Sequence, residues 1–372
     1  MAGKTTWLMV MGLGGLTAAF ALAACGGEDE GKGSGKPTAE GKAAARDPAV
    51  AFLDGITAFN EASVKGVREA FAPGAAWWNP TRAMAPARGI GPIIKALSAF
   101  KAFVPDSRIS ARRVLRRGNN LMAQAVVTGT KRWTDHGTEE EPKRIGFDIA
   151  YFVLADGLGR ARETIVYFDA AVAQRQTGAL RGEVRPVPVP PADKPEIVGA
   201  PGVKGTVEKA EAALAALGRG GAGMEGLVSK GFVYIDTTTG RQLALAELPA
   251  FLAAQVPPLT GLTYRTQQSI AAGSFVAIRW EAKAGYAGGD GAEPADITLH
   301  GAHVFTVTDG EISAVETYTS SLERLEKTGL LAQYVAGETD ALGPRGPVTP
   351  APTPTPAPTT TPTPAPDPGR TP

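Results

Sequence analysis

The chain has 372 residues, 43% of them hydrophobic and 20% charged, which is enough apolar material for about two domains of ordinary size. Its 38 basic and 37 acidic residues leave a formal net charge of +1, so it lacks the positive charge that nucleic acids attract. One cysteine and three histidines exclude an intramolecular disulfide and leave little material for a metal site. We therefore expect no metal, no cofactor and no nucleic-acid partner.

The N-terminus has the layout of a secretory signal peptide, with Lys4 before an apolar and small-residue run at 7–24. The sequence Leu22-Ala23-Ala24-Cys25 resembles the bacterial lipobox, where cleavage precedes a cysteine whose thiol carries diacylglycerol. The resemblance implies a signal peptide at 1–24, lipidation of Cys25 and a membrane anchor in the cell envelope. Gly26 in place of aspartate favours the outer membrane. The alternative is an uncleaved membrane helix, because about 18 apolar residues just span a bilayer.

Three further segments lack the large apolar residues that a core requires. Residues 25–47 are mostly small or charged and predict a flexible tether. Residues 337–372 include a run of prolines and threonines, which predicts a disordered, extended tail. Residues 186–195 form a proline-rich linker between two blocks of similar size, 48–185 and 196–336.

The two blocks are similar in sequence, which indicates a tandem repeat. Residues 167–180 align with 318–331 and share a tyrosine, a Thr-Gly pair and a final leucine. Asp156-Gly157 likewise aligns with Asp309-Gly310.

The sequence of each block predicts helices followed by strands. In the first block, apolar spacing predicts helices within 52–71 and at 90–103, a short strand at 75–78, and later strands at 107–116, 121–133, 145–154 and 162–169. The second block repeats this order, with helices near 207–217 and 243–254 and strands at 232–235, 263–270, 275–284, 297–306 and 312–319. The pattern predicts an α+β class, with two cone-shaped α+β barrel domains that each wrap an antiparallel sheet around a helix. We expect no parallel strands within a block and no sheet that continues across the linker.

Each block resembles the SnoaL-like branch of the nuclear-transport-factor-2-like superfamily, which includes ketosteroid isomerase and polyketide ester cyclases. The similarity is carried by four segments of the first block: 71–80 (FAPGAAWWNP), 88–94 (RGIGPII), 103–106 (FVPD) and 167–180 (YFDAAVAQRQTGAL). The second block, over 203–335, is similar more weakly. The resemblance implies a cone-shaped fold with a pocket for a small hydrophobic or amphipathic ligand.

Family enzymes of the cyclase branch place an aspartate, and often a histidine, in this pocket. Asp169 matches the closing aspartate of the family, whereas its counterpart in the second block is Ser320. The family's Gly-Thr-His segment is Gly129-Thr130-Lys131 in the first block and Ala282-Lys283-Ala284 in the second, without histidine. Any proton transfer is therefore expected in the first block.

Two acids are candidate general bases, Asp148 and Asp169. Asp148 shares a strand face with Gly146, Ala150 and Phe152, so it either points into the cone or faces solvent. Asp169 either acts as a base beside Tyr167 or caps the helix that follows it. An enzyme interpretation requires one of these acids to line a concave pocket.

Six further residues are candidate ligand contacts, for aromatic walls or polar recognition. They are Trp78, Trp133, Tyr167, His303, Glu316 and Tyr318. We expect His303, Glu316 and Tyr318 to form one polar set in the second block.

Two functions remain open. The chain is a lipid-anchored envelope protein that binds a small ligand or acts as an assembly module through packing between domains or between two copies. Alternatively, it is a cyclase-like or isomerase-like enzyme that uses an acid of the first block. The fold does not decide between them.

Overall fold

The computed structural model describes residues 45–82, 85–131, 134–135, 138–139, 141–255, 258–289 and 292–335, with only the backbone at 134–135 and 138–139. The chain divides into two units, Met1–Ala336 and Gly337–Pro372, and only the first contains described residues. The predicted signal peptide, Cys25 and the tail therefore lie outside the described residues and stay predictions.

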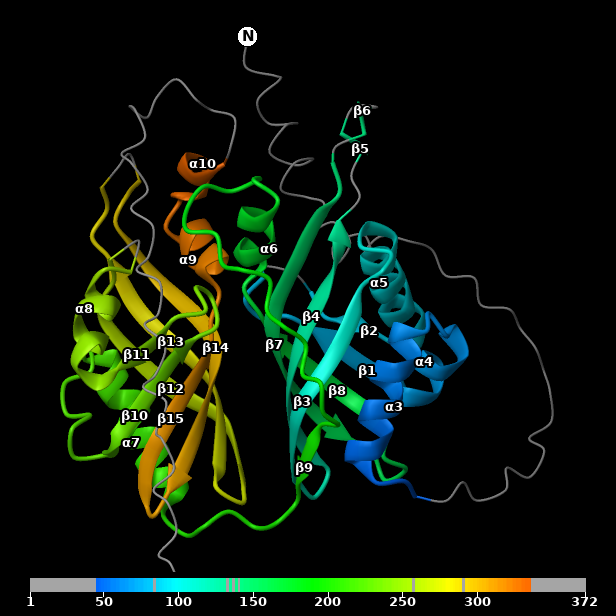
Figure 1. The fold of residues 1–372 in the computed structure, drawn as a ribbon, viewed down its shortest axis with the longest axis horizontal. Coiled ribbons are helices and arrows are strands. Elements are labelled where there is room, and N and C mark those ends of the chain that lie inside the picture. Colours follow the sequence, from blue (N-terminus) through cyan, green and yellow to red (C-terminus); the bar gives the residue numbers. More distant parts are fainter. Residues whose placement is uncertain are drawn as a thin grey trace, which may run out of the picture. The chain divides into compact units, whose positions relative to one another are not determined.

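The first domain begins with helices α3 (Pro48–Asn60) and α4 (Val64–Ala70), and its elements follow in the predicted order (Figure 1). They are β1 (Phe71–Trp78), β2 (Ala87–Arg88), α5 (Ile90–Phe103), β3 (Arg108–Arg117), β4 (Asn120–Lys131), β5 (Thr134–Asp135), β6 (Thr138–Glu139), β7 (Lys143–Ala155), β8 (Ala161–Tyr167) and α6 (Ala170–Gln176). Asp47 starts α3 by accepting a hydrogen bond from the Ala49 amide at 2.8 Å. Helix α5 spans the predicted residues and stops before Pro105, which cannot continue a helix.

The second domain repeats this order after β9 (Glu196–Val198). Its elements are α7 (Thr206–Gly218), β10 (Val228–Asp236), β11 (Gln242–Ala244), the 3₁₀ helix η2 (Leu245–Glu247), α8 (Leu248–Ala253), β12 (Thr260–Ala272), β13 (Phe275–Tyr286), β14 (Ala295–Thr308), β15 (Glu311–Tyr318), α9 (Ser321–Lys327) and α10 (Leu331–Tyr334). The predicted α+β class with two domains is confirmed.

The strands of both sheets follow one topology. The first sheet has the order β2-β1-β8-β7-β4-β3-β9 and the second has the order β11-β10-β15-β14-β13-β12. Each order places the short second strand beside the first, and the first beside the last strand of the antiparallel meander. This shared order agrees with the repeat in the sequence.

Two expectations about strand pairing were wrong. Strand β1 runs parallel to β8, and β10 runs parallel to β15. No tight turn joins the members of either pair, so nothing forces them to be antiparallel. Strand β9, which follows the linker, pairs in parallel with β3, so the first sheet does continue across the linker.

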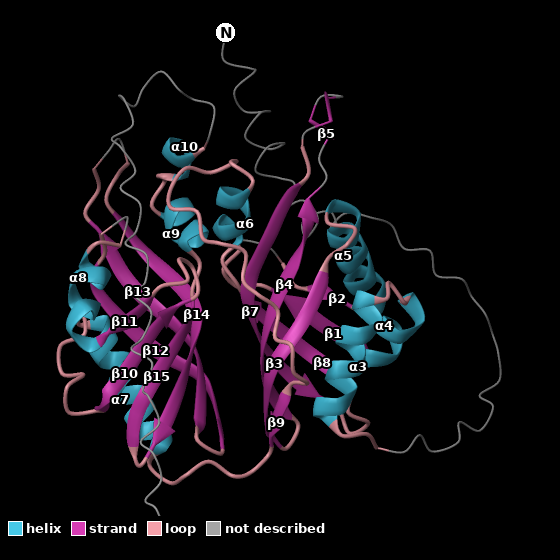
Figure 2. Ribbon diagram, viewed as in Figure 1, coloured by secondary structure: helices cyan, strands magenta, loops and turns pink. Residues whose placement is uncertain are grey.

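Helices α3, α4 and α5 lie on one side of the first sheet, and α7 and α8 lie on one side of the second (Figure 2). The helix-side core of the first domain includes Phe59, Phe100, Phe147 and Phe168. The helix-side core of the second domain lies between α7 and the second sheet and includes Leu214, Trp280 and Phe305.

The opposite faces of the two sheets bury each other. A single cluster combines Phe152 and Tyr167 of the first domain with Phe275, Val304 and Tyr318 of the second. Strand β7 is consequently buried along almost its whole length, whereas the first half of β12 alternates between partly buried and exposed residues. We call this layer the sheet interface.

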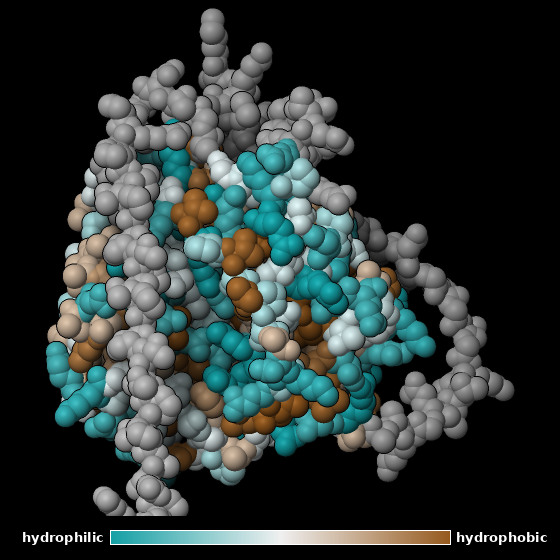
Figure 3. Space-filling model, in the orientation of Figure 1, coloured by the Kyte–Doolittle hydropathy of each residue, from teal (hydrophilic) through white to brown (hydrophobic). Residues whose placement is uncertain are grey.

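The face shown in Figure 3 mixes hydrophobic and hydrophilic residues. Exposed large hydrophobic side chains include Val184 and Val189 at the linker and Val203 shortly after it. Within the described ranges, no helix is both long enough and apolar enough to cross a membrane.

Candidate functional site

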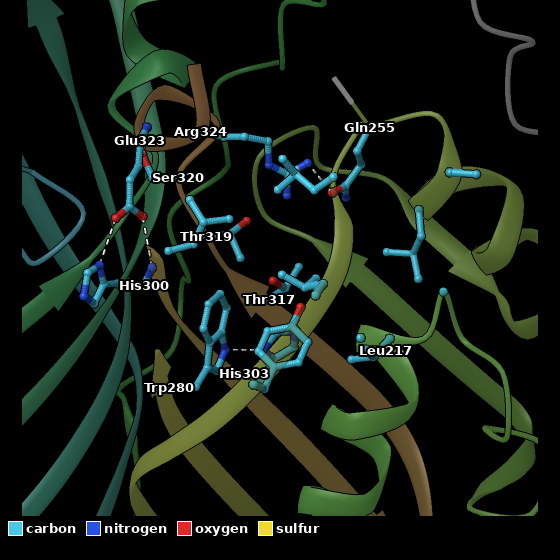
Figure 4. Close-up of a pocket in the computed structure, with 18 of the residues that line it drawn as sticks. Leu217, Gln255, Trp280, His300, His303, Thr317, Thr319, Ser320, Glu323 and Arg324 are labelled. Carbon is cyan, nitrogen blue, oxygen red and sulfur yellow. Dashed lines mark hydrogen bonds and ion pairs between the residues drawn. The ribbon is translucent and has the colours of Figure 1, made fainter. Parts of the chain in front are cut away.

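A cavity of about 340 Å³ lies in the second domain, which we call the cone cavity (Figure 4). Helices α7 and α8 and strands β10, β12, β13, β14 and β15 contribute to its walls. Its apolar lining includes Leu217, Leu252, Leu259, Leu262 and Leu299, and its aromatic and polar lining includes Tyr234, Tyr264, Trp280, His303, Thr317 and Arg324. An apolar cavity with a few convergent polar groups is typical of a small-molecule site.

An aromatic wall forms one end of the cone cavity. The indole Nε1–H of Trp280 donates a hydrogen bond to His303 Nδ1 at 2.6 Å. The Tyr264 ring packs edge-on against Trp280, with ring centroids 4.7 Å apart and planes at 80°. Gly301 stands opposite Trp280 across β13 and β14, and a Cβ there would lie 2.5 Å from the indole ring. Glycine at this position therefore lets the indole lie flat on β14.

His303 is a neutral hydrogen-bonding group. Because Nδ1 accepts the indole proton, the neutral ring carries its own proton on Nε2. The side chain is only 2% exposed, and burial lowers its pKa to about 3. Near neutral pH the ring can donate one hydrogen bond to a ligand but cannot exchange protons.

Charged side chains lie away from this wall, as Figure 4 shows for Glu323 and Arg324. The buried Glu323 carboxylate lies 2.8 Å from His300 Nδ1 and 2.9 Å from Lys327 Nζ. It also accepts a hydrogen bond from the His300 amide at 3.1 Å, so both of its oxygens have partners. Arg324 donates to Gln255 Oε1 at 2.8 Å.

The interior of the first domain is filled by its own side chains within the described residues. Phe147 stacks on Phe168 with ring centroids 4.9 Å apart, and Phe59 stacks on Phe100 at 6.3 Å. A cavity of about 80 Å³ remains between α3, α4 and the sheet. This volume is far smaller than that of the cone cavity.

Asp169 caps helix α6, as the structural alternative predicted. Its Oδ1 accepts the amides of Ala171 at 3.0 Å and Leu322 at 3.3 Å. Its Oδ2 accepts the Ser321 hydroxyl at 2.5 Å. The carboxylate is 4% exposed and joins α6 of the first domain to α9 of the second. Ser320 caps α9 in the equivalent way, through the Glu323 amide at 3.1 Å.

Asp148 points away from the cone, as the second alternative predicted, but it is buried and does not lie in solvent. It faces the sheet interface, 6% exposed, where it pairs with Arg185 and lies 3.7 Å from Arg112. Arg112 also binds Glu316 at 2.8 Å and the Tyr318 hydroxyl at 3.0 Å. These five side chains make a balanced polar network between the domains.

The expected set of His303, Glu316 and Tyr318 was also wrong. His303 stands opposite Thr317 across β14 and β15, so the residues on either side of Thr317 point to the other face. Those residues are Glu316 and Tyr318, which lie at the sheet interface.

The remaining predicted contacts lie elsewhere. Tyr167 belongs to the sheet interface and Trp78 packs against it. Trp133 lies outside the described residues. No group of three metal-ligating side chains occurs within the described ranges.

Sequence reasoning missed most of the cone cavity. Of the residues that line this cavity, only His303 was among the predicted ligand contacts. Tyr264 and Tyr234 carried a usable signal, since each lies on a predicted β segment, but Arg324 lies on the closing helix, where no pattern singled it out.

The fold is similar to several solved structures over about a third of the chain. IdmH, a proposed polyketide cyclase from Streptomyces antibioticus, is 19% identical with a TM-score of 0.33, over 36% of this chain and 99% of that one. AclR from Streptomyces galilaeus, a proposed hydroxylase, is 13% identical with a TM-score of 0.32, over 36% and 97%. TsrD from Streptomyces laurentii is 19% identical with a TM-score of 0.31, over 36% and 95%.

No curated protein matches the chain. The family model described as the SnoaL-like domain matches it twice, at residues 49–159 and 210–315, which together exceed half of its length. The chain belongs to the SnoaL-like domain family and carries two copies of that domain in tandem.

Proposed function

We propose that the second domain binds a small ligand with an apolar, aromatic body in the cone cavity. The observation that carries this proposal is the cavity itself, about 340 Å³ with leucine and aromatic walls around a neutral histidine. Its volume and lining are those of small-molecule sites in general. The Nε2–H of His303 supplies a donor for a carbonyl or hydroxyl oxygen of the ligand.

Binding is favoured over catalysis by the positions of the acids. Neither Asp148 nor Asp169 is among the residues that line the cavities of about 340, 310 and 80 Å³. A general base must be within hydrogen-bond reach of the proton that it removes and must titrate near the working pH. His303 has a pKa of about 3, and Glu323 is held by His300 and Lys327. The cone cavity therefore suits recognition better than proton transfer.

The uncharged probe N-phenyl-1-naphthylamine tests the proposal, because its fluorescence rises in apolar surroundings. We expect the wild-type protein to bind this probe and Leu262→Trp to weaken binding by about tenfold or more, which corresponds to about 1.4 kcal/mol. The new indole would occupy the cavity, since Leu262 lines it. Titration of probe fluorescence gives the dissociation constants.

Thr263→Trp is the matched control. Thr263 is the next residue of β12, is exposed and points to the opposite face. The Thr263→Trp variant should bind the probe as the wild type does. Equal binding by wild type and Leu262→Trp, or no binding by the wild type, would contradict a site in the cone cavity.

We further propose that the mature chain is held at the outer membrane by a lipid on Cys25. The support is the lipobox-like Leu22-Ala23-Ala24-Cys25, which contains the only cysteine of the sequence.

Cys25→Ala should abolish metabolic labelling with an alkyne fatty acid and release the protein from membranes, as measured by fractionation. Gly26→Asp is the control that keeps the thiol and should keep the label. Continued membrane attachment of Cys25→Ala would instead indicate that the apolar run is the anchor.

A further inference from the structure

A second cavity, of about 310 Å³, adjoins the cone cavity and is lined by four arginines, Arg175, Arg181, Arg241 and Arg324. We call it the arginine cavity. Its walls come from both domains, because Arg175 lies in the last turn of α6 while Arg324 lies on α9. Gln255, Thr319 and Arg324 line both cavities, so the two are neighbours with Arg324 between them.

Three of these arginines form no ion pair within 4.0 Å of a described carboxylate, although burial lowers the pKa of Arg324 and the nearby Asp236 and Asp169 oppose that shift. Arg324 donates to the neutral Gln255, Arg175 donates to the Ser321 hydroxyl at 3.0 Å, and Arg241 lies over the Phe251 ring at 5.5 Å. A guanidinium that is drawn away from water without a counter-charge carries a desolvation cost. An anion in the cavity would offset that cost.

Two buried polar atoms on the same walls lack a hydrogen-bond partner among the described residues. They are Arg175 Nε and Thr238 Oγ1. Such atoms are uncommon in folded proteins and indicate a missing partner. Both can donate, as an anionic oxygen requires.

The acidic groups of the arginine cavity are fewer than its basic groups. Asp236 accepts the Thr239 hydroxyl at 2.7 Å and the Thr239 amide at 3.0 Å, so its carboxylate is used by its own turn. Glu183 is exposed. The four arginines therefore exceed the two acids on these walls.

We infer that the ligand of the cone cavity carries one anionic group, a carboxylate, sulfonate or phosphate, that Arg324 binds with support from Arg241 and Arg175. This inference rests on the proposed function and adds the charge of the ligand to it. Figure 4 shows Arg324 well apart from Trp280 and His303, so an aromatic body and an anionic group can bind at separate ends. Guanidinium groups suit such anions because they offer paired donors in one plane.

Two probes with the same aromatic body test the anionic group separately from binding in the cone cavity. N-phenyl-1-naphthylamine is uncharged, and 1-anilinonaphthalene-8-sulfonate adds one sulfonate. We expect the wild type to bind the sulfonate about tenfold more tightly or better, the effect of one or two charge-assisted hydrogen bonds. Arg324→Gln and Arg241→Gln should each remove most of that advantage. Arg241→Gln, which leaves the lining of the cone cavity intact, should bind the uncharged probe as the wild type does.

Arg265→Gln is the control, because Arg265 pairs with Glu281 at 3.1 Å and lines neither cavity. It should keep the preference for the sulfonate. If replacing the buried Arg324 disturbs folding, Arg241→Gln still tests the inference, because Arg241 lines only the arginine cavity. Equal affinity for both probes, or equal weakening of both by the arginine variants, would overturn the inference while the proposed function stands. Failure of the wild type to bind either probe would overturn both.

Discussion

Replacing Asp169 by alanine should lower the free energy of unfolding by about 3–4 kcal/mol, the combined effect of a lost helix cap and of buried donors left without an acceptor. The carboxylate accepts hydrogen bonds from Ala171, Ser321 and Leu322. Two of these donors belong to the second domain, so the variant weakens α6 and its junction with α9 together. Urea denaturation of the full chain measures the effect.

Two variants show whether the cost comes from the junction. Ser320→Ala removes the equivalent cap in the second domain, which satisfies only the Glu323 amide, and should cost about 1 kcal/mol. Asp169→Asn keeps one carbonyl oxygen in place and should cost clearly less than alanine. A loss of stability in Asp169→Ala no greater than that in Ser320→Ala would mean that the bonds to Ser321 and Leu322 contribute nothing.

The elements were predictable because their signals are local. Helix α5 follows a regular apolar spacing and ends before Pro105, and its bounds agree with the prediction. Strands β3, β4, β7 and β8 lie where alternation and β-branched residues predicted them. The parallel pairing of β1 with β8 was not predictable in this way, because it joins segments that are more than 80 residues apart in the sequence.

The surroundings of Asp148 could not be predicted, for a physical reason. Along β7, Phe147, Ile149 and Tyr151 occupy one face while Asp148, Ala150 and Phe152 occupy the other. Both faces are rich in apolar residues, because one packs on the helices and the other on the second sheet. Alternation alone therefore separates the faces but does not identify the one inside the cone.

Which cone is open was not predictable either. The first domain retains more of the family motifs, yet among its described residues Phe147, Phe168, Phe59 and Phe100 occupy much of the interior. The volume left between helices and sheet depends on how side chains of distant elements interlock, which no motif records. Arg324 illustrates the same point, since its neighbour Gln255 lies 69 residues away along the chain.

The His303 imidazole should make the protein sensitive to mild acid. In the unfolded chain a histidine titrates near pH 6.5, whereas the folded protein holds His303 neutral down to about pH 3 because the ring is buried. Between these values the unfolded chain binds one more proton, so the stability is fully present above pH 6.5 and falls as the pH falls. The loss is about 1.4 kcal/mol per pH unit and ends near pH 3, where both states are protonated, after roughly 5 kcal/mol in total.

Urea denaturation at a series of pH values between 7 and 4 measures this loss, and His303→Gln isolates it. The glutamine cannot titrate but can still accept the Trp280 indole proton, so its stability should fall less steeply with pH than that of the wild type. His300→Gln, which leaves the bond between His303 and Trp280 intact, should keep the steep dependence. Parallel stability curves for wild type and His303→Gln would mean that the folded protein accepts a proton on this ring, and His303 would then be available for proton exchange at the wall of the cone cavity.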